Sequence, residues 1–230
     1  MIIDEHIQTL LEKYIQNNSV VSFGTGPTNE TFLKKLGLYI EQNSLNIKVV
    51  PTAHSMALLC NQLKIKTVSL DEVEIDLAFD FVDQVDEEFN YISNETTSLI
   101  RDKMIAQDAG ELVVACEEKD FVPRLSGTIR VEASTFAVKK TILQLMNLGD
   151  AKLVASFDKP KMSETGNYFI DLKMDEIYSL EDLDYEAKRI PGILETSLFI
   201  GYADRVILHG STLTVKSRLT NPEAPLTAEE

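Results

Sequence analysis

The sequence predicts an α/β protein, with a doubly wound, mostly parallel sheet and a smaller α+β domain of the split βαβ, ferredoxin-like kind. As far as Cys116, short apolar runs alternate with segments of helical spacing, a pattern typical of βαβ units. The run Leu112–Ala115 is apolar on both faces, as expected for a strand that helices cover on both sides. After Arg130 the order of the elements changes, which indicates a second domain.

In the first part of the chain, helices are expected where apolar residues recur at intervals of three and four. The first such segment spans residues 4–17 and places Ile7, Leu10 and Leu11 on one face. The other segments of this kind are residues 28–40, 55–63 and 96–109. Strands are expected at the β-rich runs between them, which are residues 19–23, 47–50, 75–79 and 111–116.

The second part of the chain predicts the order β-α-β-β-α-β of a split βαβ module. Helices are expected at residues 138–148 and 180–190, and strands at residues 151–156, 168–174 and 193–200. The runs 206–208 and 213–215 are expected to return the chain to the main sheet. The predicted domains are residues 1–130 plus 206–219 and residues 131–205, followed by a polar tail at 220–230 that is expected to be disordered.

Composition narrows the class of protein. The chain has 230 residues, 44% of them hydrophobic, which suffices for a real core. A net charge of −15 argues against a sequence-independent grip on nucleic acid, which needs a basic surface. No secretory leader and no membrane span are expected. The two cysteines, Cys60 and Cys116, are too few for a disulfide framework, so a cytoplasmic location is expected.

A glycine-containing loop follows the first expected strand. Gly24 and Gly26 allow a tight turn and a close approach of backbone to a ligand. Thr28 is positioned to cap the next helix, whose free N–H groups favour an anion. Neither the Walker pattern nor the full dinucleotide fingerprint is present. The loop is therefore either a plain turn or a phosphate site.

The loop after the next strand has a similar character. Thr52 and Ser55 precede a helix and either cap it or bind an anion, the plain cap being the commoner case. His54 has no metal-ligand spacing to another histidine or cysteine, so no metal site is predicted.

Carboxylates gather where strands are expected to end. Asp80 and Asp83 follow the strand that ends at residue 79, and Asp102 lies in the helical run after it. Lys119 follows the fourth strand. Ligands of α/β proteins usually bind at this edge of the sheet, so the group suggests proton-transfer chemistry. The alternative is a set of solvated acids, including the acidic run at residues 83–88, with Lys119 equally solvated.

Together, these segments resemble ribose-5-phosphate isomerase of the A type, in order over residues 4–210. The most specific matches are Gly166–Asp171, to Gly-Asn-hydrophobic-Ile-hydrophobic-Asp, and Ile190–Phe199, to Ile-Pro-Gly-Val-Val-x-x-Gly-Leu-Phe. The further matches are Gly24–Thr28 to the phosphate loop, Asp80–Asp83 to Asp-Gly-Ala-Asp, Arg101–Ala106 to Arg-Glu-Lys-Ile-hydrophobic-Ala, Lys119 to Ser-Lys, and Arg130–Glu132 to Pro-Val-Glu.

The resemblance implies an aldose–ketose isomerase that interconverts ribose 5-phosphate and ribulose 5-phosphate through a cis-enediolate, without a metal or other cofactor. It implies Asp102 as the base, Asp80 and Asp83 as the acids that hold sugar hydroxyls and assist ring opening, and Lys119 as a cation. It also implies a homodimer or homotetramer. The implied phosphate-binding residues are Gly24, Thr25, Gly26, Thr28 and Thr52.

The departures from the family pattern fall near the chemistry. Where the family has Lys and several Gly, this chain has Ser93–Thr97. Asp102 stands in place of a Glu, Phe81 in place of a Gly, and Ser197 in place of a Gly. Two hypotheses follow: a divergent isomerase, which the retained acids favour, or a non-catalytic relative that binds a sugar phosphate or a protein partner, which the altered loop favours.

Overall fold

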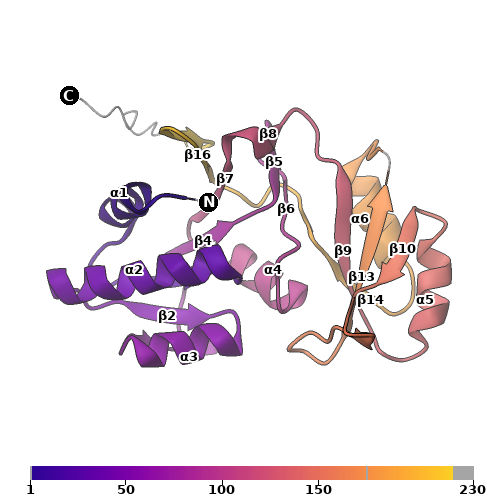
Figure 1. Cartoon of the computed structure of the whole chain (residues 1–230), viewed down its shortest axis with the longest axis horizontal. Coiled ribbons are helices and arrows are strands. Elements are labelled where there is room, and N and C mark those ends of the chain that lie inside the picture. The colour runs from indigo at the N-terminus through magenta and orange to yellow at the C-terminus, as the bar shows by residue number, and fades with distance from the viewer. Residues whose placement is uncertain (1, 175, 220–230) are drawn as a thin grey trace.

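The computed structural model describes residues 2–174 and 176–219, so the predicted tail at residues 220–230 lies outside the described residues. The fold is of the α/β class, with one large sheet and one smaller sheet side by side (Figure 1). Six α-helices are present in the described part of the chain: α1 (Asp4–Tyr14), α2 (Pro27–Asn43), α3 (His54–Gln62), α4 (Leu99–Asp108), α5 (Val138–Leu145) and α6 (Leu180–Lys188).

The large sheet has seven strands in the order β17-β16-β7-β4-β1-β2-β3. All neighbours pair in parallel except β16 and β17, which are antiparallel. In sheet order, the bounds are Leu213–Ser217, Arg205–His209, Leu112–Glu117, Leu77–Phe81, Val20–Phe23, Lys48–Pro51 and Lys66–Thr67. The carboxyl ends of β1, β4 and β7 therefore meet at one edge, as the sequence predicts.

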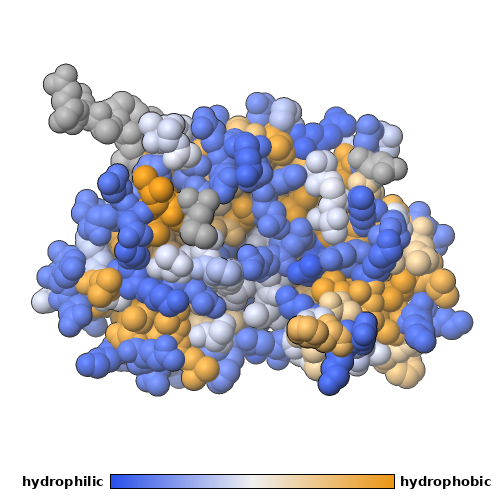
Figure 2. Space-filling view, in the orientation of Figure 1, coloured by the Kyte–Doolittle hydropathy of each residue, from blue (hydrophilic) through white to orange (hydrophobic). Residues whose placement is uncertain are grey.

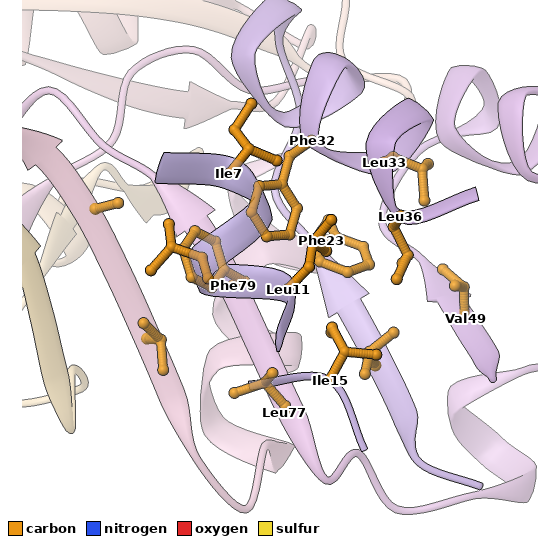
Figure 3. Packing of buried hydrophobic residues seen from close by; sticks show 14 of the residues in the cluster. Ile7, Leu11, Ile15, Phe23, Phe32, Leu33, Leu36, Val49, Leu77 and Phe79 are labelled. Carbon is orange, nitrogen blue, oxygen red and sulfur yellow. The ribbon is translucent and has the colours of Figure 1, made fainter. Parts of the chain in front are cut away.

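Helices cover both faces of this sheet. On one face, aromatic and aliphatic side chains of α1, α2 and α3 pack against the sheet, and Phe32 stacks on Phe79 with 4.8 Å between ring centroids (Figure 3). On the other face, Ile105 and Ala106 of α4 pack against Val114. Burial on both faces explains why the central strands are apolar throughout. The two cores also hold the ends of β1 and β4 in place, from which the candidate site is built.

The smaller sheet has four antiparallel strands in the order β10-β13-β9-β14. In that order the bounds are Asp150–Leu153, Tyr168–Met174, Gly127–Ala133 and Ile193–Thr196. The central strand β9 is absent from the elements that the sequence analysis named individually, although Ile129, Val131 and Ala133 alternate and are fully buried. The division into domains at residues 130 and 205 stays a prediction.

A third, short sheet joins the two. Its order is β15-β6-β5-β8, with bounds Leu198–Phe199, Tyr91–Ile92, Gln84–Asp86 and Phe121–Val122. The prediction of one strand at residues 193–200 was wrong, because β14 pairs with β9 whereas β15 pairs with β6. Ser197 is the residue at which the chain changes sheets. A separate hairpin of β11 (Ala155–Ser156) and β12 (Lys159–Pro160) extends from the smaller sheet.

Most other expected elements are present with shifted bounds. The helix expected at residues 96–109 begins only at Leu99, because the Ser98 hydroxyl accepts a hydrogen bond from the Arg101 N–H and caps it. Strand β4 runs two residues further than expected and includes Asp80. Hydrophilic residues cover much of the face seen in Figure 2, and hydrophobic patches lie between them on both halves of the molecule. No described helix is long and apolar enough to cross a membrane.

Candidate active site

The turn after β1 brings Asp80 against the glycine loop. β1 and β4 are parallel, with Phe23 opposite Phe79, and the Gly24 N–H donates to the Phe79 carbonyl at 3.0 Å. A Cβ atom on Gly24 would lie 1.7 Å from Oδ1 of Asp80. Only glycine therefore leaves room for this carboxylate at the edge of the sheet.

Asp80 is held by neutral donors. The Asn29 side-chain amide donates to Oδ1 of Asp80 at 2.8 Å, and the Ser93 hydroxyl donates to Oδ2 at 3.3 Å. Burial raises the pKa of Asp80 well above its ordinary value, the charge of Asp102 raises it further, and the two donors act in the opposite direction. Asp80 is thus a carboxyl group that holds a proton more tightly than a solvated one.

Asp102 lies in the first turn of α4, beside Asp80. Its Oδ2 accepts a short hydrogen bond from the Thr96 hydroxyl. Desolvation by burial raises the pKa of Asp102 to about 7, although the Thr96 hydrogen bond and the charge of Arg101 lower it. A carboxyl group with this pKa both accepts and donates protons at neutral pH, which is what general acid–base catalysis requires.

Asp80 and Asp102 line one cavity together with Gly24, Thr52 and Tyr91. The cavity has about 20 Å³ for water centres, which is room for about one water molecule. The Tyr91 ring stacks on Phe199 at 4.4 Å and closes the cavity from the side of the short sheet. The structure thus brings two of the three predicted carboxylates into one cavity.

Asp83 lies at the exposed rim of the site. Its Oδ2 accepts a hydrogen bond from the Asn94 N–H at 2.8 Å. Its side chain reaches solvent, but the surrounding protein still desolvates the carboxyl and raises its pKa, which the Asn94 hydrogen bond and the charge of Arg130 lower. The reading of residues 83–88 as one exposed acidic run was wrong at Asp86, which is 6% exposed and accepts a hydrogen bond from the Asn90 N–H.

Lys119 is placed away from the enclosed carboxylates. It lies in the 3₁₀ turn Glu118–Asp120, its side chain is 74% exposed, and its Nζ pairs with Glu117 at 2.7 Å. Its neighbour Asp120 is close enough for its charge to raise the pKa of Asp83. Lys119 therefore stands near the rim, and a role for it as the cation of the site stays a prediction.

The candidate phosphate loop opens α2. Gly26, with φ of +100°, is the residue before the helix, and Pro27 is the first residue in it. The prediction that Thr28 caps this helix was wrong, because Thr28 already lies within its first turn. The Thr25 hydroxyl donates to the Glu95 carbonyl at 3.1 Å. A Cβ on Gly26 would lie 2.8 Å from Cδ of Glu95, so the Glu95 carboxylate lies directly over the loop.

A residue far away in the sequence caps the helix that follows the second loop. The residue before α3 is Ala53, and the helix has no side-chain cap from Thr52 or Ser55, contrary to the expected local cap. Instead the His54 N–H donates to both carboxylate oxygens of Glu164, at 3.0 and 2.9 Å. The Thr52 hydroxyl donates to the Phe23 carbonyl at 2.8 Å, so Thr52 ties the two loops together.

The sequence analysis did not identify several residues of the site. Asn29 follows the predicted Thr28 by one position and reaches Asp80 because the first turn of α2 faces the end of β4. Glu132 is fully buried beneath the first turn of α4, where its Oε2 accepts from the Ser98 hydroxyl and the Ile100 N–H, each at 3.3 Å. Burial raises the pKa of Glu132, but hydrogen bonds from Ser163, Thr165 and others outweigh it and leave the pKa lowered.

The fold and the site together define a class of protein. Carboxyl groups with raised pKa values stand at the carboxyl edge of a parallel sheet, next to a glycine turn that opens a helix. This arrangement is typical of an enzyme that moves protons on a small molecule bound in the crevice.

Comparison with known proteins identifies the family. Residues 48–212 match the family model of ribose 5-phosphate isomerase A (phosphoriboisomerase A). Ribose-5-phosphate isomerase A of Thermococcus kodakarensis is 32% identical over 211 residues, covering 89% of this chain and 92% of the relative. The protein of the same name from Bacillus mycoides is 30% identical over 200 residues, covering 85% and 90%. The chain belongs to the ribose 5-phosphate isomerase A family.

Solved structures agree with this assignment. Ribose 5-phosphate isomerase A from Methanocaldococcus jannaschii superposes with a TM-score of 0.84 at 26% identity, covering 94% of this chain and 100% of that one. A D-ribose-5-phosphate isomerase in complex with phospho-erythronic acid has a TM-score of 0.84 at 31% identity, covering 92% and 96%.

Proposed function

We propose that this protein is an isomerase that interconverts ribose 5-phosphate and ribulose 5-phosphate by shuttling a proton between C1 and C2 of the sugar. The observation that carries the proposal is the pKa of about 7 for Asp102, in the same cavity as Asp80. A base with that pKa is deprotonated in a large fraction of molecules at neutral pH, and its conjugate acid returns the proton readily.

In the proposed reaction, ionised Asp102 takes the proton from C2 of the open-chain aldose. The electron pair forms the C1–C2 double bond of a cis-enediolate, whose negative charge lies on the oxygen of C1. Asp102 then returns the proton to C1, the oxygen of C2 becomes the carbonyl, and the hydroxyl proton passes from that oxygen to the oxygen of C1. Asp80 and Asp83 hold the sugar hydroxyls, and the raised pKa of Asp80 suits it to carry this second proton and to assist ring opening.

The remaining predicted residues hold the substrate in this proposal. Gly24, Thr25, Gly26 and Thr28 bind the phosphate at the start of α2, with Thr52 beside them and Lys119 as a cation at the rim. Ligand sites of ordinary size occupy roughly 300–1,000 Å³, and the cavity at Asp102 is about 20 Å³. The substrate therefore extends beyond this cavity, towards the segment Ser93–Thr97, which contacts both Asp80 and the glycine loop.

The finer description of the molecule also belongs to this proposal. Helices on both faces of the parallel sheet support a doubly wound fold, and the antiparallel order β10-β13-β9-β14 supports a split βαβ, ferredoxin-like domain. The division into residues 1–130 plus 206–219 and residues 131–205 follows from it. A cytoplasmic location and a homodimer or homotetramer are proposed as well; light scattering of the purified chain measures the oligomeric state.

The test is an assay of the purified chain with ribose 5-phosphate, carried out in D₂O and followed by NMR. We expect ribulose 5-phosphate to form with deuterium at C1, because the proton on Asp102 exchanges with solvent before it returns. Conversion no faster than in the buffer blank would overturn the proposal. It would leave the non-catalytic alternative, for which a raised melting temperature in millimolar ribose 5-phosphate is the matching measurement.

A further inference from the structure

Residues at which this chain departs from the family pattern meet in one place. The Ser197 hydroxyl donates to Oδ1 of Asn94 at 2.7 Å. The Arg130 N–H donates to the same Oδ1 at 2.9 Å, and the Arg130 guanidinium donates through Nη1 to the Asn94 carbonyl at 2.7 Å. The Asn94 amide in turn donates to the Thr128 carbonyl at 3.0 Å. Asn94 therefore ties the segment that covers the site to β9 and to Ser197, the residue after β14.

The Arg130 side chain is fixed before any substrate arrives. Its Nε and Nη2 donate to the two carboxylate oxygens of Asp171, at 2.8 and 3.2 Å. The guanidinium carbon lies 5.8 Å from the centre of the Phe169 ring. The Arg130 side chain is only 16% exposed. A forked, two-point contact of this kind sets the position of a guanidinium more sharply than a lysine can be set.

The fixed guanidinium acts on Asp83 in two ways. It holds the backbone of Asn94, whose N–H donates to Oδ2 of Asp83 at 2.8 Å. Its positive charge also lowers the pKa of Asp83, against the effects of burial and of the charge of Asp120. The other charged groups around Arg130 are Asp171, its ion-pair partner, and Lys161, which also feels the charge of Glu95.

We infer that Arg130 is a positioning residue of the isomerase site: it supplies a fixed positive charge beside Asp83 and holds Asn94 in the orientation that binds the Asp83 carboxylate. The inference rests on the proposed function and assigns the cation that the altered segment Ser93–Thr97 lacks. A purely structural ion pair needs only the Asp171 contact. The third contact, to the Asn94 carbonyl, connects Arg130 to the acid that handles the sugar hydroxyls.

The experiment compares Arg130→Met and Arg130→Lys with the control Arg189→Met. Arg189 pairs with Glu186 at 3.1 Å on the exposed side of α6, far in sequence from the site. We expect Arg130→Met to lower kcat/KM roughly 10- to 100-fold, since small misplacements near the chemistry cost about this much. Arg130→Lys keeps the charge but loses the fork, so a smaller loss is expected. Arg189→Met is expected to match the wild type.

A second readout separates positioning from mere stability. In protein labelled with ¹³C at the Asp carboxyl groups, Arg130→Met is expected to move the titration of Asp83 to higher pH, whereas Arg130→Lys and Arg189→Met leave it in place. An Asp83 titration that does not move in folded Arg130→Met would overturn the inference. If Arg130→Met does not fold, Asp171→Asn takes its place. We expect kcat/KM to fall in Asp171→Asn, and an unchanged kcat/KM would count against the inference. A wild type without isomerase activity refutes the proposed function alone, because the titration tests Arg130 independently.

Discussion

Two carboxylates flank the first turn of α4, and their pKa values are shifted in opposite directions. Asp102 faces the cavity and accepts a side-chain hydrogen bond from Thr96, and burial raises its pKa to about 7. Glu132 lies on the other side, in the smaller sheet, and is fully buried. Its Oε1 accepts hydrogen bonds from Ser163, Thr165 and Asn167, and its pKa is lowered.

The two carboxyl groups differ in how far hydrogen-bond donors offset the cost of desolvation. Desolvation raises the pKa of both groups. Hydroxyl, amide and backbone donors around Glu132 replace the lost water and keep it ionised, so that it anchors α4. The site at Asp102 leaves the carboxyl short of donors, so that it exchanges protons near neutral pH. The anchor, Glu132, and the proposed proton carrier, Asp102, thus lie on either side of the same turn of α4.

The largest expected effect is on turnover. Asp102→Asn removes the group that accepts the C2 proton without changing its size, and we expect kcat to fall by roughly 10²–10⁴-fold, the range for a general base. Asp108→Asn is the matched control, because Asp108 is exposed at the end of the same helix. Steady-state rates with ribose 5-phosphate measure both variants. Equal rates for the two would remove Asp102 from the role of base.

The next effect is on stability. Glu132→Gln keeps the shape but presents an NH₂ group to donors, so we expect the free energy of unfolding to fall by about 2–3 kcal/mol, as for lost hydrogen bonds to a charged group. Urea denaturation measures it, with Glu186→Gln on the exposed face of α6 as control. Because the folded pKa of Glu132 is lowered, its contribution is present above its ordinary pKa of 4.5 and is lost as the pH falls through the folded value.

Glu132→Gln also tests the link between the two acids. The charge of Glu132 raises the pKa of Asp102. Removing it is expected to move the acid limb of the kcat/KM profile to lower pH, even though Glu132 touches no substrate. If the acid limb stays in place while the free energy of unfolding falls, the charge of Glu132 does not influence the protonation of Asp102.

The sequence predicts the two acids unequally well, and the reason is where the hydrogen-bond partners of each acid lie in the sequence. The proximity of Asp80 and Asp102 was predictable, because each lies at the end of a strand or the start of a helix, and those ends meet at one edge of the sheet. The donors to Glu132 were not, because Ser98, Ser163 and Asn167 are separated by up to 35 residues from it and meet only in the folded chain. The same reason hid the contacts of Arg130, whose partners Asn94 and Asp171 are 36 and 41 residues away in the sequence.

A third carboxylate extends the comparison to the surface. Glu95 is exposed and lies over Gly26, at the place proposed for the phosphate. Glu95→Gln removes a like charge there, so we expect KM for ribose 5-phosphate and the inhibition constant of inorganic phosphate to fall by roughly 2–5-fold, the size of an exposed charge interaction. Glu74→Gln, exposed and far from the loop in sequence, is the control. Unchanged constants would argue against phosphate at the glycine loop.

The smallest effect isolates a single donor. The Thr96 hydroxyl donates to Asp102 and lowers its pKa, whereas the neighbouring Thr97 hydroxyl is buried without a hydrogen-bond partner among the described residues. Thr96→Val is expected to move the acid limb of the kcat/KM profile upward from about pH 7 by less than one unit, with the plateau at high pH retained. Thr97→Val makes the same replacement of a hydroxyl by a methyl group and is expected to leave the limb in place. Equal shifts in the two variants, or a downward shift with Thr96→Val, would contradict the inference that the Thr96 hydroxyl lowers the pKa of Asp102.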